Sequence, residues 1–64
     1  MKREPQLIEQ IISGPNGTRI YEINGIYYAV DGQASDANDL MDSYWTKDSN
    51  LDRLRQKILK EAGY

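Results

Sequence analysis

The stretch ISGPNGTRIYEINGIYYAV, residues 12–30, decides the fold of this chain. It holds two turn sequences, Gly14-Pro15-Asn16-Gly17 and Asn24-Gly25, and the residues around them are rich in isoleucine, tyrosine and valine. β-Branched and aromatic residues favour strands, and Asn-Gly is the dipeptide most typical of a two-residue hairpin loop. The sequence therefore predicts a β-hairpin formed by residues 18–23 and 26–30.

The Asn-Gly turn also predicts which residues share a face of the sheet, because residues directly opposite each other point their side chains the same way. The expected pairs are Ile23 with Ile26, Tyr21 with Tyr28 and Arg19 with Val30. One face then carries Leu7, Ile11, Tyr21, Ile23, Ile26, Tyr28 and Val30, and we expect it to be the core. The other face carries Ile8, Ile12, Ile20, Tyr27 and Ala29, with Gln10 and Glu22.

The segment before the first turn, residues 6–13, has two interpretations. A Gly-Pro-Asn-Gly hairpin turn needs a strand on each side, so a third strand is favoured. A three-residue loop Pro15-Asn16-Gly17 would place Ile12 opposite Ile20 and Ile11 opposite Tyr21. The alternative is a helix that begins near Pro5 and itself covers the second sheet face. Residues 1–5 are expected to be a flexible lead to a single small domain, residues 6–64.

Two helices are predicted after the sheet. Ser35 is a candidate N-cap, and the first apolar stripe has helical spacing: Ala37, Leu40, Met41, Tyr44 and Trp45. Ser49 and Asp52 resemble a capping box for the second helix, which Gly63 ends. Its stripe is Leu51, Leu54, Ile58, Leu59 and Ala62. The predicted class is α+β: a three-stranded antiparallel β-meander followed by two helices packed on one sheet face (β-β-β-α-α).

Composition weighs against catalysis. The 64-residue chain has no histidine and no cysteine, so it lacks the commonest general base, the strongest nucleophile and any disulfide. We therefore expect no enzyme activity, no catalytic residues, no metal and no cofactor. No apolar run approaches the about 18 residues of a membrane-spanning helix, and no signal-peptide pattern follows the N-terminus. A cytoplasmic protein without membrane contact is the expectation.

The second sheet face supplies the first functional hypothesis. If both helices lie on the other face, its apolar residues form an exposed patch, and such a patch normally marks an interface. The partner-binding candidates are Ile8, Ile12, Ile20, Tyr27 and Ala29. They predict a protein partner or a homo-oligomer such as a homodimer.

The last helix supplies the alternative. Arg53, Lys57 and Lys60 follow one another at helical spacing and form a basic ridge that could contact the phosphates of a nucleic acid. The net charge of −2 and the aspartate-rich stretch before this helix oppose that interpretation. Arg55 falls within the apolar arc of the helix, and we expect it to pair with Glu9 at the edge of the core.

Two segments carry a family resemblance. Residues 18–30 read TRIYEINGIYYAV and residues 54–62 read LRQKILKEA. They resemble the transposon-encoded TnpW-type accessory proteins of Firmicutes mobile elements, which have a TR-x-I-x-G-x-x-Y-x-V hairpin and a terminal K-I-x-x-x-I-x-x-E helix. The spacing inside the hairpin differs here. The resemblance implies an origin in a transposon, plasmid or phage, and it implies no reaction and no site residues.

The sequence thus predicts a non-enzymatic interaction or regulatory protein, encoded by a phage or another mobile element, that binds a partner protein or itself. Inhibition of a host or defence factor fits by analogy with small acidic phage proteins. A small nucleic-acid-binding accessory factor is the alternative function.

Overall fold

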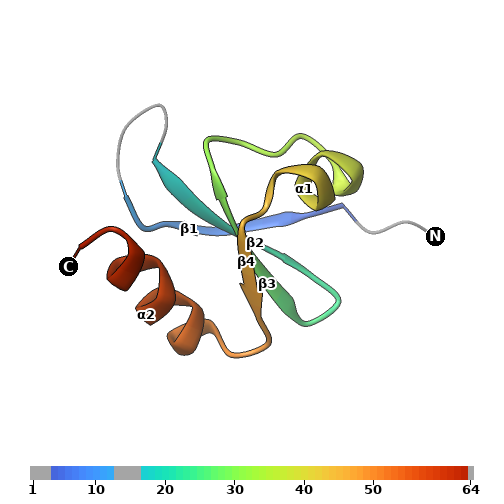
Figure 1. The fold of residues 1–64 in the computed structure, drawn as a ribbon. Helices are drawn as coiled ribbons and strands as arrows, with labels where there is room; N and C mark the ends of the chain where they lie inside the picture. The colour runs from blue at the N-terminus through green and yellow to red at the C-terminus, as the bar shows by residue number, and fades with distance from the viewer. Residues whose placement is uncertain (1–3, 13–16, 64) are drawn as a thin grey trace.

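The computed structural model describes residues 4–12 and 17–63, and within them it holds a four-stranded antiparallel sheet and two helices (Figure 1). The strands lie in the order β1-β2-β3-β4, which is also their order along the chain. The elements are β1 (Gln6–Gln10), β2 (Thr18–Ile23), β3 (Ile26–Asp31), α1 (Ala37–Ser43), β4 (Thr46–Asp48) and α2 (Leu51–Glu61). The predicted α+β class is confirmed, with a short strand added before the last helix.

The central hairpin agrees with its prediction in every pair. Ile23 lies opposite Ile26, Tyr21 opposite Tyr28 and Arg19 opposite Val30. Both loop residues have positive φ, 53° at Asn24 and 83° at Gly25. A type I′ turn requires this conformation, and its twist matches that of the strands it joins. The local sequence therefore specifies the turn and the register of this part of the sheet.

The two helices cover opposite faces of the sheet, so the prediction that both pack on one face is wrong (Figure 1). Leu40 of α1 packs in a cluster with Tyr21, Tyr28, Val30 and Ala34. Leu54 and Ile58 of α2 pack in a second cluster with Ile20 and Ala29. The sheet is apolar on both faces, and a layer on each face removes both from water.

The first strand is confirmed, but its predicted register is wrong. Glu9, and not Ile12, lies opposite Ile20, and Leu7, and not Ile11, lies opposite Tyr21. A bulge interrupts the ladder between Leu7 and Glu9. The strand ends at Gln10, and Ile11 and Ile12 leave the ladder to pack against the α2 cluster. The connection to β2 therefore spans residues 11–17 and is longer than the predicted three-residue loop. Pro15 and Asn16 of that predicted loop lie outside the described residues.

Gly17 shows how closely the two ends of this return approach each other. A Cβ atom on Gly17 would lie 1.8 Å from the carbonyl oxygen of Ile12. Only glycine can occupy a position where backbone approaches backbone so closely. The second glycine of the turn sequence therefore permits the close approach of the backbone at Gly17, just before β2, to the backbone at Ile12, just after β1.

The first helix is shorter than its apolar stripe predicts. It ends at Ser43, and Tyr44 is its extended C-cap. The backbone N–H of Trp45 donates to the carbonyl oxygen of Ala29 at 3.0 Å, and β4 then pairs with β3. The apolar residues at positions 44 and 45 continue the helical period by chance, so periodicity alone hides the strand.

The N-cap of each helix lies one residue later than predicted, at Asp36 and at Asn50. The N–H of Asp39 donates to Asp36 at 2.8 Å, and the N–H of Arg53 donates to the side-chain oxygen of Asn50 at 3.0 Å. Gly63 ends α2 with a φ of 86°, as predicted. Asp and Asn satisfy the free N–H groups of a first turn as well as serine does.

Candidate interaction site

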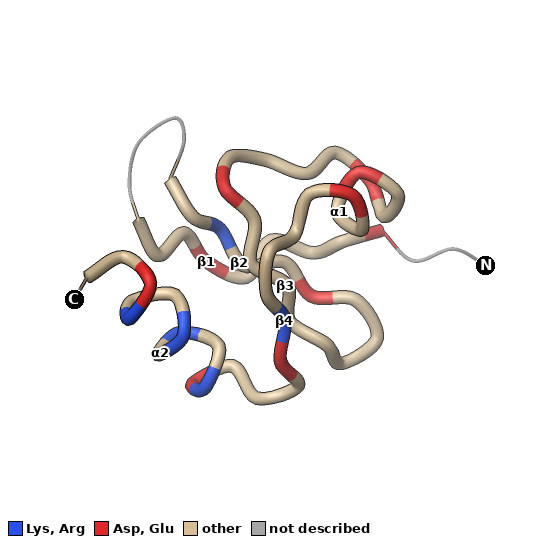
Figure 2. The backbone as a smooth tube through the Cα atoms, viewed as in Figure 1, with Lys and Arg blue, Asp and Glu red and all other residues tan. Residues whose placement is uncertain are grey.

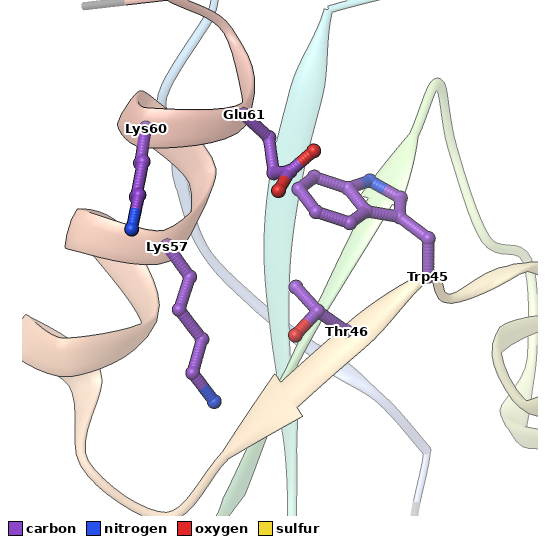
Figure 3. Close-up of a pocket in the computed structure, with 5 residues that line it drawn as sticks. All are labelled: Trp45, Thr46, Lys57, Lys60 and Glu61. Atoms are coloured by element: carbon purple, nitrogen blue, oxygen red, sulfur yellow. The ribbon is translucent and has the colours of Figure 1, made fainter.

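Trp45 is the exposed aromatic residue that borders a hollow in the surface. Its side chain is 40% exposed, although tryptophan is usually largely buried. It lies between the end of α1 and the start of β4, where the chain returns to the sheet. Trp45 directly precedes β4, and its side chain lies beside the second half of α2 (Figure 3).

Hydrogen bonds fix the orientation of this ring. Its indole Nε1 donates to Oδ1 of Asp31 at 3.2 Å, while its backbone N–H is held by Ala29. The same Asp31 oxygen accepts a hydrogen bond from the hydroxyl of Thr18 at 2.9 Å, and Thr18 is buried. The ring is therefore anchored through Asp31 to the ends of β2 and β3, although much of its surface faces water.

Trp45 lines two hollows in the surface. The larger, of about 490 Å³, is lined by Trp45, Thr46, Lys57, Lys60 and Glu61. The smaller, of about 280 Å³, shares Trp45 and Glu61 and adds Ile12, Thr18, Asp31, Ile58 and Ala62. Figure 3 shows the Glu61 carboxylate pointing toward the indole ring. We call the two hollows together the Trp45 groove.

One carboxylate pairs with two of the three cations of the predicted basic ridge. Arg53 Nε and Lys57 Nζ both contact Oδ2 of Asp48 at 3.1 Å. A hydrogen bond from the backbone N–H of Asn50 holds the pKa of Asp48 below its usual value, and the two cations lower that pKa further. Asp48 is therefore ionised at neutral pH and cancels positive charge at the start of the ridge. Within the described part of the chain, Lys60 makes no ion pair.

The charge asymmetry of the sequence becomes an asymmetry between the two layers (Figure 2). Acidic residues, Asp39 and Asp42, lie on α1, and the cations Arg53, Arg55, Lys57 and Lys60 lie on α2. The α2 layer also carries Asp52 and Glu61. The surface of α2 is thus mixed in charge and does not form an unbroken basic face.

The predicted pair of Glu9 and Arg55 is confirmed. Arg55 Nη2 contacts Oε1 of Glu9 at 2.5 Å, and its Nη1 contacts Asp52 at 2.9 Å. The hydrogen bond to Glu9 is the main cause of the raised pKa of Arg55. This pair joins β1 to α2 across the edge of the sheet and occupies an arginine that could otherwise contact a ligand.

The partner-binding candidates of the sheet face do not form an exposed patch. Ile20 and Ala29 are completely buried beneath α2, and Ile12 and Tyr27 pack against them. Ile8 is 36% exposed on the edge strand. The premise that this face is uncovered is wrong, because the second helix lies on it. Of the five residues, only Ile12 lines the Trp45 groove.

Sequence reasoning missed the groove because it placed Trp45 inside a helix. The signal was the break after it, Thr46-Lys47-Asp48, where a β-branched residue follows two aromatic ones. Asp31 carried no signal, since an aspartate before a glycine at the end of a strand is an ordinary turn residue. Its role depends on Trp45 reaching it across 14 residues of chain.

Comparisons with protein families, curated proteins and solved structures found no match to this chain. The resemblance to transposon-encoded accessory proteins therefore stays a prediction. In residues 4–12 and 17–63, no group of three or more acidic side chains gathers as metal ligands. No helix in the same residues is long and apolar enough to cross a membrane.

Proposed function

We propose that this protein is a non-enzymatic interaction protein that binds a partner protein through the Trp45 groove. The observation that carries the proposal is an exposed tryptophan whose orientation is fixed by hydrogen bonds. Tryptophan is enriched among the residues that dominate binding energy in protein interfaces. A ring that is already ordered loses little conformational entropy on binding, so more of its contact energy appears as affinity.

The charges of the groove favour a protein over a nucleic acid. Lys57 and Lys60 are accompanied by two carboxylates, Asp31 and Glu61, and Lys57 is already paired with Asp48. Binding to nucleic acid depends on neutralising several phosphates, and carboxylates in the site oppose this. Interfaces between proteins instead combine an aromatic centre with a polar rim, as this groove does.

The experiment compares two alanine variants of similarly exposed residues. Trp45 is 40% exposed and lines the groove, while Leu59 is 38% exposed and does not. The tagged protein is purified from the cells that encode it, and its associated proteins are quantified by mass spectrometry. A partner recovered with the wild type is then purified, and its affinity is measured by calorimetry.

We expect Trp45→Ala to weaken that affinity about 30-fold, which corresponds to the about 2 kcal/mol of a hot-spot residue. Leu59→Ala should bind as the wild type does. Equal losses in the two variants, or recovery of partners that is independent of Trp45 and abolished by nuclease, would contradict the proposal. Circular dichroism of both variants confirms that each is folded.

The remaining sequence-based predictions belong to this proposal as well. They are a cytoplasmic location, an origin in a mobile element and inhibition of the partner that is bound. Identification of the partner tests the location and the inhibition, because its own location and activity become measurable in the presence of this protein. The genes that neighbour the gene of this protein test the origin.

A further inference from the structure

The charged residues of the Trp45 groove are separated along its length. Lys57 and Lys60 line the larger hollow and not the smaller one, whereas Asp31 lines the smaller hollow and not the larger one. Trp45 and Glu61 border both hollows. The groove therefore has a basic end near β4, an aromatic centre and an acidic end where the start of β2 pairs with the end of β3.

Each end keeps a charge that the rest of the described chain does not cancel. Lys60 makes no ion pair among residues 4–12 and 17–63, and neither does Glu61. Among the described residues, the Asp31 side chain accepts hydrogen bonds only from neutral donors, the hydroxyl of Thr18 and the indole N–H of Trp45. Such donors satisfy the carboxylate oxygen and leave its negative charge in place.

The floor of the smaller hollow is apolar. Ile58 is 1% exposed there, and Ile12 and Ala62 border the same space. Together with the indole ring they form a surface for one aliphatic or aromatic side chain. The larger hollow, of about 490 Å³, lies within the range of about 300–1,000 Å³ that is typical of small-ligand sites, and the smaller, of about 280 Å³, falls just below it.

We propose that the Trp45 groove binds a linear peptide segment of its partner in one fixed direction. An apolar side chain packs on Trp45, an acidic side chain lies at the Lys57 and Lys60 end, and a basic side chain lies at the Asp31 and Glu61 end. This inference rests on the proposed function and names the kind of segment that the groove takes. Opposed charges at the two ends give orientation and specificity more than affinity.

The experiment selects peptides from a displayed library of random linear sequences against the purified protein. We expect the enriched peptides to place acidic and basic residues on opposite sides of an apolar residue, always in the same order along the peptide. Their affinity for Trp45→Ala should fall at least about tenfold, because the packing surface is lost.

A charge swap tests the direction. The double variant Lys60→Glu with Glu61→Lys keeps the net charge at −2 and changes two exposed residues that make no ion pair in the described chain. It leaves the larger hollow with one net positive charge and takes the smaller hollow from two net negative charges to none. Peptides selected on this variant should keep the acidic residue and lose the basic one, and wild-type peptides should bind the variant at least about tenfold more weakly. Gln56→Ala, on the same helix but outside the groove, is the matched control and should select wild-type sequences.

Each outcome decides between the two proposals. Peptides that need Trp45 but show no charge order, or that keep their basic residue on the swapped variant, overturn the fixed direction and leave the proposed function standing. Failure to enrich any peptide that needs Trp45 overturns the linear-segment inference. A natural partner whose recovery still depends on Trp45 would then show that the groove binds a folded surface.

Discussion

Ile58 and Leu59 are neighbours on α2 with opposite expected effects, and they test whether this helix covers the second sheet face. Ile58 is 1% exposed and packs with Ile20, Ala29 and Leu54, whereas Leu59 is 38% exposed. The predicted apolar stripe of this helix holds both residues, so a helix packed along the whole stripe would bury both. Truncation of each residue to alanine therefore measures which side of the helix packs on the sheet.

The magnitude follows from what each truncation removes. Ile58→Ala deletes three buried carbons, worth about 0.8 kcal/mol each, or about 2.4 kcal/mol in total. The cavity that remains adds to this, and measured values for such changes lie at about 2–5 kcal/mol. The whole domain is expected to have a free energy of unfolding of about 3–10 kcal/mol, at about 0.05–0.15 kcal/mol per residue. Ile58→Ala thus removes a large share of the total, while Leu59→Ala should cost less than about 1 kcal/mol.

The assay is urea unfolding followed by circular dichroism and by the fluorescence of Trp45, the single tryptophan of the chain. Coincident transitions from the two signals would justify a two-state treatment. The midpoint should fall for Ile58→Ala with little change in the slope, since the slope follows the surface exposed on unfolding. Equal losses for the two variants, or a loss below about 1 kcal/mol for Ile58→Ala, would refute the packing of α2 on this face.

Three further predictions concern the turns, the pH dependence and nucleic acid. Gly25→Ala should lower the free energy of unfolding by about 1–2 kcal/mol, because a φ of 83° is unfavourable for any residue with a Cβ atom. No clash adds to this cost, since nothing lies within 4 Å of the added carbon. Gly17→Ala should cost more, because its Cβ would lie 1.8 Å from a backbone oxygen; a smaller loss in urea unfolding would contradict this close approach. The pKa values of Asp39 and Asp48 are lowered by hydrogen bonds from Ser35 and from the N–H of Asn50, respectively. Their stabilisation is therefore complete above the unfolded value of about 3.9 and is lost as the pH falls below it, and Asp48→Asn should flatten this part of the stability curve. Filter binding at low salt should detect no DNA or RNA complex, whereas a complex that weakens steeply with salt would favour the nucleic-acid function.

The parts of the fold that sequence reasoning predicted correctly are those set by neighbouring residues. Asn24-Gly25 specifies the loop of the central hairpin, and the pairing of β2 with β3 follows from it. The C-terminal end of α2 follows from Gly63, which adopts positive φ without a steric cost. The pair of Glu9 and Arg55 was also predicted, because each charge interrupts an apolar pattern and the two signs are opposite.

The errors arose where one local pattern admits two structures. The helical spacing of Tyr44 and Trp45 predicted that the first helix continues through both residues. In the structure the helix ends before Tyr44, and the chain then forms β4, which pairs with β3. The apolar residues of the first segment predicted a strand, but a bulge and an early end at Gln10 shifted its register. Such a shift changes which residues of this strand face each helix. The predicted surface was wrong for a different reason, because α2 covers it.

The sequence by itself determined that this chain forms a sheet apolar on both faces and two amphipathic helices, because turns, caps and periodicity act over a few residues. Only the tertiary structure decided which face each helix covers. The short strand β4 lies at the sheet edge between α1 and α2, and an edge is where a chain can pass from one face to the other. That passage buries Ile20 and Ala29, which the sequence offered as an interface, and leaves Trp45 exposed and fixed beside α2 as the candidate for one.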